Sequence, residues 1–112
     1  MPTTISGVLY EDKQAGEGPA VQSGDEVAVH YSGWLDDGTQ FDTSKQPGRG
    51  PFSFKVGAGR VIQGWEEGVV GMQKGSIREL TIPADMGYGA RAIGPIPANS
   101  TLHFEIELIE IT

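Results

Sequence analysis

The sequence of 112 residues contains no cysteine and no long apolar run. Without cysteine the chain can form neither a disulfide nor a thiolate metal site, which suits a reducing compartment. No stretch approaches the ~20 apolar residues of a membrane span, and the N-terminal MPTTISGVLYEDKQ has neither the basic start nor the apolar core of a secretory signal. We therefore expect a cytoplasmic protein with no membrane partner. A chain whose signal had already been removed would give the same pattern.

Basic residues are also scarce. The chain has 8 lysines and arginines against 15 aspartates and glutamates, and its net charge is -7. Such a field repels phosphate backbones, so we expect no nucleic-acid partner. The acidic residues are spread along the chain rather than gathered in a tail, which indicates solubility rather than a specific function.

Motifs for covalent, metal or phosphate chemistry are missing as well. The serines lack a nucleophile-elbow pattern, and the glycine-rich string GAGRVIQG at 57–64 lacks the lysine-serine ending of a P-loop. His30 and His103 lie on the polar faces of predicted strands, where a solvated histidine is more common than a metal ligand. The sequence therefore predicts no metal and no cofactor.

Hydrophobic residues make up 38% of the sequence, enough for one compact core, and we expect a single domain over residues 1–112. Many of them alternate with polar residues at the period of two that is typical of half-buried strands. This pattern predicts about four or five strands in an antiparallel sheet with one buried face. The strands are expected at 27–32, 52–56, 78–82 and 101–108, with a hairpin at 34–41 that turns at Asp37-Gly38.

Helical spacing occurs only around a tryptophan in the string VIQGWEEG at 61–68. Its apolar positions fall on one side of a helix: Ile62, Trp65, Val69 and Met72. Each glycine within a helix costs about 1 kcal/mol relative to alanine, so packing on the sheet must hold this short helix. Those glycines are Gly64, Gly68 and Gly71, and they would let a neighbour come close. The fold class is therefore α+β, with Trp65 pointing into the gap between helix and sheet.

Aromatic residues recur at strand ends and turns, although any one of them alone is explained by the core of a small domain. As a set they lie in four strings that follow one another in a recognisable order: VHYSGWLDDGTQFDTS, PFSFKVGAGRVIQGWEEGVVGM, LTIPADMGYGA and IPANSTLHFEIELIEI. In this order the chain resembles the FKBP-type peptidyl-prolyl cis-trans isomerases from about Gly7 to its C-terminus. The resemblance implies a curled antiparallel sheet of about five strands wrapped around one short α-helix.

The resemblance also implies a shallow apolar pocket that holds a prolyl ring over the indole of Trp65. The residues that it assigns to catalysis are Tyr31, Asp42, Ile62, Trp65 and Tyr88, and those that it assigns to ligand binding are Phe41, Phe52, Val61, Ile96 and Phe104. The backbone N–H of Ile62 and the hydroxyl of Tyr88 would donate hydrogen bonds to ligand carbonyls, and Asp42 would be the polar group near the proline. Simpler roles exist too: Asp42 could bond locally within FDTS, and Tyr88 could order its glycine-flanked loop.

The implied function is the isomerisation of Xaa-Pro bonds during protein folding. Proline-containing polypeptides would be the substrates, tacrolimus- or rapamycin-type macrolides would bind in the same pocket, and the protein would be a monomer. The alternative is a non-catalytic module or chaperone of the same fold that holds proline segments. Retention of the whole set of aromatic and polar positions favours the enzyme.

Departures from the family pattern lie on the rim of the expected pocket. The loop 89–97 is one residue shorter than in the best-known members, which affects substrate preference and macrolide contacts. The segment 45–50 is one residue longer, which leaves the role of Arg49 open. Arg60 stands where some relatives have an acidic residue; because the family's ligand contact there is made by backbone, we expect little loss.

Overall fold

The computed structural model describes residues 3–5, 8–45, 50–92, 94 and 96–111. In these residues the chain forms a seven-stranded antiparallel sheet, one α-helix and a short 3₁₀ helix. The strands are β1 (Thr3–Ile5), β2 (Val8–Gln14), β3 (Glu26–Trp34), β4 (Gln40–Thr43), β5 (Phe52–Lys55), β6 (Ile77–Ile82) and β7 (Leu102–Ile111). The α-helix is α1 (Gln63–Gly68), and the 3₁₀ helix η1 covers Ala84–Met86.

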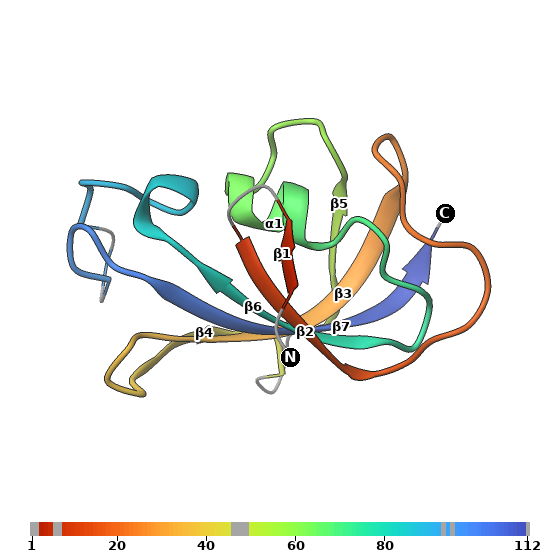
Figure 1. Ribbon diagram of the computed structural model, residues 1–112, viewed down its shortest axis with the longest axis horizontal. Coiled ribbons are helices and arrows are strands. Elements are labelled where there is room, and N and C mark those ends of the chain that lie inside the picture. The colour runs from red at the N-terminus through yellow and green to blue at the C-terminus, as the bar shows by residue number, and fades with distance from the viewer. Residues whose placement is uncertain (1–2, 6–7, 46–49, 93, 95, 112) are drawn as a thin grey trace.

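The sheet has the strand order β1-β2-β6-β7-β3-β4, with β5 paired to β3 outside this path. Strand β3 is therefore shared on one side: β5 pairs with its first half and β4 with its second half. Figure 1 shows that the sheet curls into a trough and that α1 lies within its concave side. The predicted fold class, a curled antiparallel sheet around one short helix, is confirmed.

Strand β7 supplies much of the core because its side chains alternate as the sequence predicts. Leu102, Phe104, Ile106 and Leu108 are all buried, with at most 4% of their surface exposed. Each buried side chain of this size stabilises the fold by roughly 1.5–3 kcal/mol. The valines of β3 continue the same inner face across the sheet.

Two strands at the N-terminus are missed by the sequence pattern. In β2 only Val8 is fully buried, and from Glu11 to Gln14 the side chains are exposed or half-buried. A strand with so little burial carries almost no period-two signal. It is identified instead by its backbone pairing with β6, which is irregular between Asp12 and Gln14.

The predicted hairpin at 34–41 is confirmed, and it joins β3 to β4. Gly38 has φ of +88°, a conformation that glycine adopts without strain. The backbone N–H of Thr39 donates to Oδ1 of Asp37 at 2.9 Å. Hydrogen bonds from Thr39 also lower the pKa of Asp37. The turn thus fixes how β4 returns along β3, which matters because β4 carries two of the predicted pocket residues.

Helix α1 is shorter than the sequence pattern suggests. The spacing places Gly71 and Met72 in the helix, but the helix ends at Gly68, and this part of the prediction is wrong. Gly71 has φ of +91° and turns the chain away, while Met72 reaches the core from the following turn. Arg78 explains the early end, because its guanidinium donates to the backbone oxygens of Gly68 and Val70, both at 3.0 Å.

Arg78 is a buried cation whose role no sequence pattern indicates. Its side chain comes from β6 and pairs with Asp12 of β2, with 2.7 Å between Nε and Oδ1. The guanidinium also lies 4.2 Å from the centre of the Tyr10 ring, a favourable cation–π contact. Arg78 therefore ties the C-terminal end of α1 to two strands at once.

Glycines set the distance between α1 and the sheet. A Cβ atom on Gly64 would lie 2.5 Å from Cγ2 of Ile82, and one on Gly68 would lie 2.7 Å from Cδ1 of Leu80. Real side chains do not approach so closely, so only glycine allows the helix to rest at this depth. The glycines thus let the helix pack closely against the buried side chains of β6.

Among the described residues, no helix has the length and apolar character needed to cross a membrane.

Gly64→Ala should lower the free energy of unfolding by about 1–2 kcal/mol, because overpacking at so close a contact costs about 2–3 kcal/mol and helix propensity returns only about 1 kcal/mol. Urea denaturation measures the change. Gly50→Ala is the matched control, since a Cβ there meets nothing within 4 Å. In an Ile82→Ala background the contacted atoms are gone, so Gly64→Ala should then cost little. A Gly64→Ala variant as stable as the parent would contradict the close-contact interpretation.

Candidate active site

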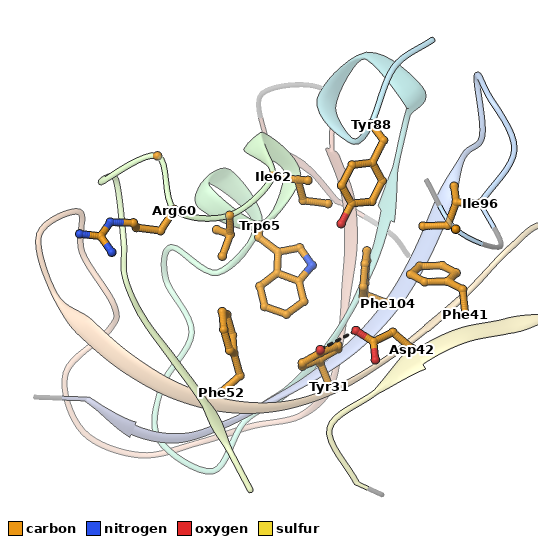
Figure 2. A pocket seen from close by; sticks show the side chains of 13 residues that line it. Tyr31, Phe41, Asp42, Phe52, Arg60, Ile62, Trp65, Tyr88, Ile96 and Phe104 are labelled. Carbon is orange, nitrogen blue, oxygen red and sulfur yellow. Dashed lines mark hydrogen bonds between the residues drawn. The ribbon is translucent and has the colours of Figure 1, made fainter. Parts of the chain in front are cut away.

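A pocket of about 560 Å³ opens between α1 and the concave side of the sheet. Figure 2 shows its side chains gathered around the indole of Trp65. All of the residues predicted from the sequence lie in its wall, namely Tyr31, Phe41, Asp42, Phe52, Val61, Ile62, Trp65, Tyr88, Ile96 and Phe104. Gly59, Arg60 and Gly94 line it as well. The structure thus brings the predicted residues together, while their roles in binding and catalysis stay predictions.

Trp65 lies at the centre of an aromatic cluster, and only 5% of its surface is exposed. Its ring meets Tyr31 at 4.9 Å and Phe104 at 5.2 Å between centroids, both in edge-to-face geometry. Phe52 and Phe54 pack around it at 6.1 and 5.7 Å. Each such aromatic pair contributes roughly 0.5–1.5 kcal/mol beyond the area that it buries. The indole plane is therefore held from several sides.

The indole nitrogen of Trp65 is buried, and within the described part of the chain it has no hydrogen-bond partner. In Figure 2 the nitrogen faces the side of the pocket occupied by Tyr88 and Phe104. The neighbouring Phe104 ring stands nearly perpendicular to the indole, at 85°. Trp65 contributes mainly ring surface to the pocket wall, although its side chain carries a polar group.

Gly33 on β3 makes room for two rings of the pocket and is not identified by the sequence analysis. A Cβ atom there would lie 2.7 Å from Cζ of Phe41 and 2.8 Å from Cε1 of Phe104. These two rings meet edge-to-face, with 5.5 Å between centroids. A glycine without positive φ gives no turn signal in the sequence, so only its packing explains why it is needed here.

Asp42 and Tyr31 are joined directly. The Tyr31 hydroxyl donates to Oδ2 of Asp42 at 2.6 Å, a short bond as expected for a charged acceptor. Oδ1 of the same carboxylate accepts the backbone N–H of Thr43 at 2.8 Å. The local bond considered for Asp42 is therefore present, and it coexists with the position of Asp42 in the pocket wall.

Ser44 fixes the backbone of Tyr31 from outside the pocket, a role that the sequence pattern does not show. Tyr31 lies where the pairing of β3 changes from β5 to β4, and neither strand pairs with it. Its backbone N–H and C=O on that side therefore need another hydrogen-bond partner. The Tyr31 N–H instead donates to Oγ of Ser44 at 2.8 Å, and the Ser44 N–H donates to the Tyr31 oxygen at 2.9 Å. A buried serine thus replaces a missing strand partner.

The residues from Gly59 to Ile62 line the pocket beside α1. Glu66 of the helix accepts the backbone N–H groups of Gly57 and Gly59, the latter at 3.0 Å, and so pins this loop. Ile62 is the N-cap of α1, and its own N–H has no acceptor among the described residues. A backbone donor at the pocket wall is thereby left available, as the resemblance implies for Ile62.

Tyr88 follows η1 on a loop closed by backbone bonds from Gly89 to Ala84 at 2.7 Å and from Asn99 to Gly89 at 2.8 Å. Its hydroxyl points toward the indole in Figure 2. Partial burial raises the pKa of Tyr88 above its ordinary 10.0, and the nearby negative charge of Asp42 raises it further. Tyr88 therefore remains a hydrogen-bond donor throughout the physiological range.

Both histidines are half-buried, and each has a polar neighbour. Nδ1 of His30 lies 3.0 Å from Oγ of Ser44, and Nε2 of His103 lies 2.6 Å from Oδ1 of Asp36. In the part of the chain that the structure describes, no three acidic or histidine side chains gather as metal ligands would. Arg49 and two residues of the shortened loop, 93 and 95, lie outside the described residues.

Comparison with known proteins identifies the family. The profile of the FKBP-type peptidyl-prolyl cis-trans isomerases matches residues 18–109. The chain belongs to this family. It is therefore a peptidyl-prolyl cis-trans isomerase, as the sequence resemblance predicted.

Individual relatives agree with this assignment. FK506-binding protein 1 of Aspergillus oryzae is 51% identical over 105 residues, which cover 86% of this chain and 90% of that protein. The FK506-binding protein of Neisseria meningitidis serogroup B is 48% identical over 108 residues, covering 96% and 98%. The crystal structure of FkpA from Escherichia coli superposes with a TM-score of 0.88 at 40% identity. That match covers 99% of this FKBP-type chain but only 51% of FkpA.

The titration of Tyr88 offers a direct test of the pocket's electrostatics. Tyr88 should lose its proton above pH 10, and this step is the part of the tyrosinate absorbance that is absent in Tyr88→Phe. Asp42→Asn should lower the pKa of Tyr88 only part of the way toward its ordinary value, because burial is the larger cause of the shift. The folded state holds this proton more tightly than the unfolded chain, so its contribution to stability falls as pH rises past the ordinary value. Titration of Tyr88 at or below pH 10 would show that the hydroxyl is open to solvent.

Proposed function

We propose that this isomerase accelerates rotation about Xaa-Pro bonds of polypeptides without a covalent step, by binding the prolyl ring over Trp65. The observation that carries the proposal is a single pocket walled by aromatic rings, with a backbone donor at Ile62 and a hydroxyl donor at Tyr88. We also propose that FK506- and rapamycin-type macrolides bind in the same pocket. The names of the relatives support this for FK506. Cytoplasmic location and a monomeric state stay predictions from the sequence.

The chemistry of the reaction needs no nucleophile. Rotation of a peptide bond breaks only its resonance, against a barrier of ~18–20 kcal/mol, and an Xaa-Pro bond takes tens to hundreds of seconds unaided. In the twisted transition state the C–N bond loses double-bond character and the carbonyl group becomes less polar. An apolar site therefore disfavours the planar ground state more than the twisted state.

Few interactions are required to reach a useful rate. A tenfold acceleration corresponds to about 1.4 kcal/mol, so ~10⁴-fold needs about 5.5 kcal/mol. Burial of the prolyl ring against Trp65 removes water from the rotating bond. The N–H of Ile62 and the hydroxyl of Tyr88 can then hold the neighbouring carbonyl groups while the bond turns, a positioning effect that requires fixed donors. The bonds that fix the α1 loop and the Tyr88 loop supply that rigidity.

Asp42 has a different part in this proposal. Its carboxylate is held by the Tyr31 hydroxyl and the Thr43 N–H, so it keeps one position at the pocket wall. When resonance with the nitrogen is lost, the carbonyl carbon becomes more electrophilic, and a fixed negative charge beside it would favour this twisted state. Asp42 would thus act through its field, with Tyr31 as the residue that positions it.

Exchange between the cis and trans forms of a Leu-Pro peptide, measured by NMR, tests the proposal. Catalytic amounts of the parent protein should accelerate exchange. Trp65→Leu should abolish most of the acceleration, and Tyr88→Phe should reduce it by about tenfold, the value of one hydrogen bond of about 1.4 kcal/mol. Trp34→Leu is the matched control, because Trp34 does not line the pocket.

The result also distinguishes the enzyme from the binding module. Acceleration that is equal in Trp65→Leu and the parent would overturn the assignment of the site, provided that circular dichroism shows both variants folded. Chemical-shift changes of the Trp65 indole on adding peptide, without faster exchange, would instead indicate a module that holds proline segments. If the protein gives neither faster exchange nor chemical-shift changes, the proposed function is refuted, while the fold is unaffected.

Macrolide binding has a separate test. FK506 should inhibit the peptide exchange at stoichiometric concentration, and Trp65→Leu should weaken its binding by at least tenfold in isothermal titration calorimetry, because a large apolar contact is lost. The same Trp34→Leu control should bind normally. Full peptide activity that FK506 does not inhibit would show that the rim of this pocket has lost the macrolide contacts.

A further inference from the structure

The charged groups of the pocket wall lie at opposite ends. Arg60 and Asp42 are its only charged residues among those described, and Figure 2 shows them on opposite sides of the Trp65 indole. Asp42 is held by Tyr31 and Thr43, whereas Arg60 is exposed at the rim with its guanidinium directed outward. A polypeptide bound across the pocket would therefore pass close to the Arg60 cation on one side.

The guanidinium of Arg60 has no partner within the described residues, neither in a hydrogen bond nor in an ion pair. Glu66 is the nearby acid that could neutralise it, since its carboxylate reaches the same loop. That carboxylate is already occupied by the N–H groups of Gly57 and Gly59. Glu66 thus fixes the loop, and the Arg60 guanidinium stays available to pair with a bound ligand.

The pinned loop also decides where that cation stands. Gly59 and Arg60 both line the pocket, and the bond from Gly59 to Glu66 is adjacent to Arg60 in the chain. A cation on a fixed segment loses less entropy on pairing than one on a free loop. Its setting is unusual in a chain of net charge -7, whose general field repels acidic peptides.

We propose that Arg60 is a specificity-determining residue that selects proline-containing segments carrying a carboxylate close to the proline. This inference rests on the proposed isomerase function and names the class of substrate that this pocket prefers. An acidic side chain two or three residues from the proline reaches beyond the prolyl ring to the rim, where Arg60 can pair with it. Because the pair is solvent-exposed, the preference is modest and sensitive to salt.

The test compares peptides that differ only in charge. Each contains the same Leu-Pro unit, with Glu, Gln or Lys either three residues before the proline or two residues after it. The residue directly before the proline is kept constant, since it alters the uncatalysed rate. Catalysed exchange is measured by NMR at low peptide concentration, so that the rate reports kcat/KM.

The parent protein should favour the Glu peptide over the Gln peptide by about two- to fivefold on at least one side of the proline, the range expected for an exposed ion pair. Arg60→Gln should remove this preference, and Arg60→Glu should reverse it in favour of Lys. Lys74→Gln is the matched control: it removes the same charge from an exposed side chain outside the pocket, and the preference should remain. Raised salt should reduce the Glu preference in the parent and in the control, and the reversed preference in Arg60→Glu.

The outcomes separate this inference from the function on which it rests. Acceleration of all peptides with equal kcat/KM, or a Glu preference that persists in Arg60→Gln, would overturn the role of Arg60 and leave the isomerase intact. A preference that disappears equally in Lys74→Gln would show that the general field of the protein, rather than Arg60, selects the substrate. If the parent accelerates none of the peptides, both the proposed function and the inference fail.

Discussion

The contact between α1 and β6 is the constraint on which the rest of this structure depends. Two glycines of the helix lie directly against Ile82 and Leu80, at distances that leave no room for a methyl group. The helix has only 6 residues, too few to be stable alone, and it exists because the sheet holds it. Because Trp65 lies between the two glycines in the sequence, the distance between helix and sheet also determines how deep the Trp65 indole lies in the pocket.

Charged side chains hold the two ends of this short helix in place. At the C-terminal end, Arg78 binds the carbonyl oxygens of Gly68 and Val70 and links them to Asp12. Toward the N-terminal end, the Glu66 carboxylate collects the N–H groups of the preceding loop. A cation at the C-terminus also interacts favourably with the helix dipole. The position of the indole is thus fixed by polar contacts that lie outside the pocket.

Much of the fold follows from the sequence because its longest strands bury one face. The alternation in β3 and β7 is strong, so their inner residues are identified correctly. Strand β2 is missed because its outer half has no buried face, and the end of α1 is misplaced because the helical spacing continues to Met72 although Gly71 has already turned the chain. The pocket residues are found through family resemblance. Gly33, Ser44 and Glu66 support them through packing and backbone bonds, which no periodicity encodes.

A site for amide rotation makes demands that differ from those of hydrolysis, and this pocket meets them by rigidity. A nucleophile would need a base within reach, whereas a rotating bond needs an apolar surface and donors that do not move. Here the surface is held by rings packed at steep angles around Trp65, and the donors lie on segments closed by backbone bonds. Charge is confined to the two ends of the pocket. Selectivity can therefore vary at the rim, through residues such as Arg60, without disturbing the apolar centre on which rotation depends.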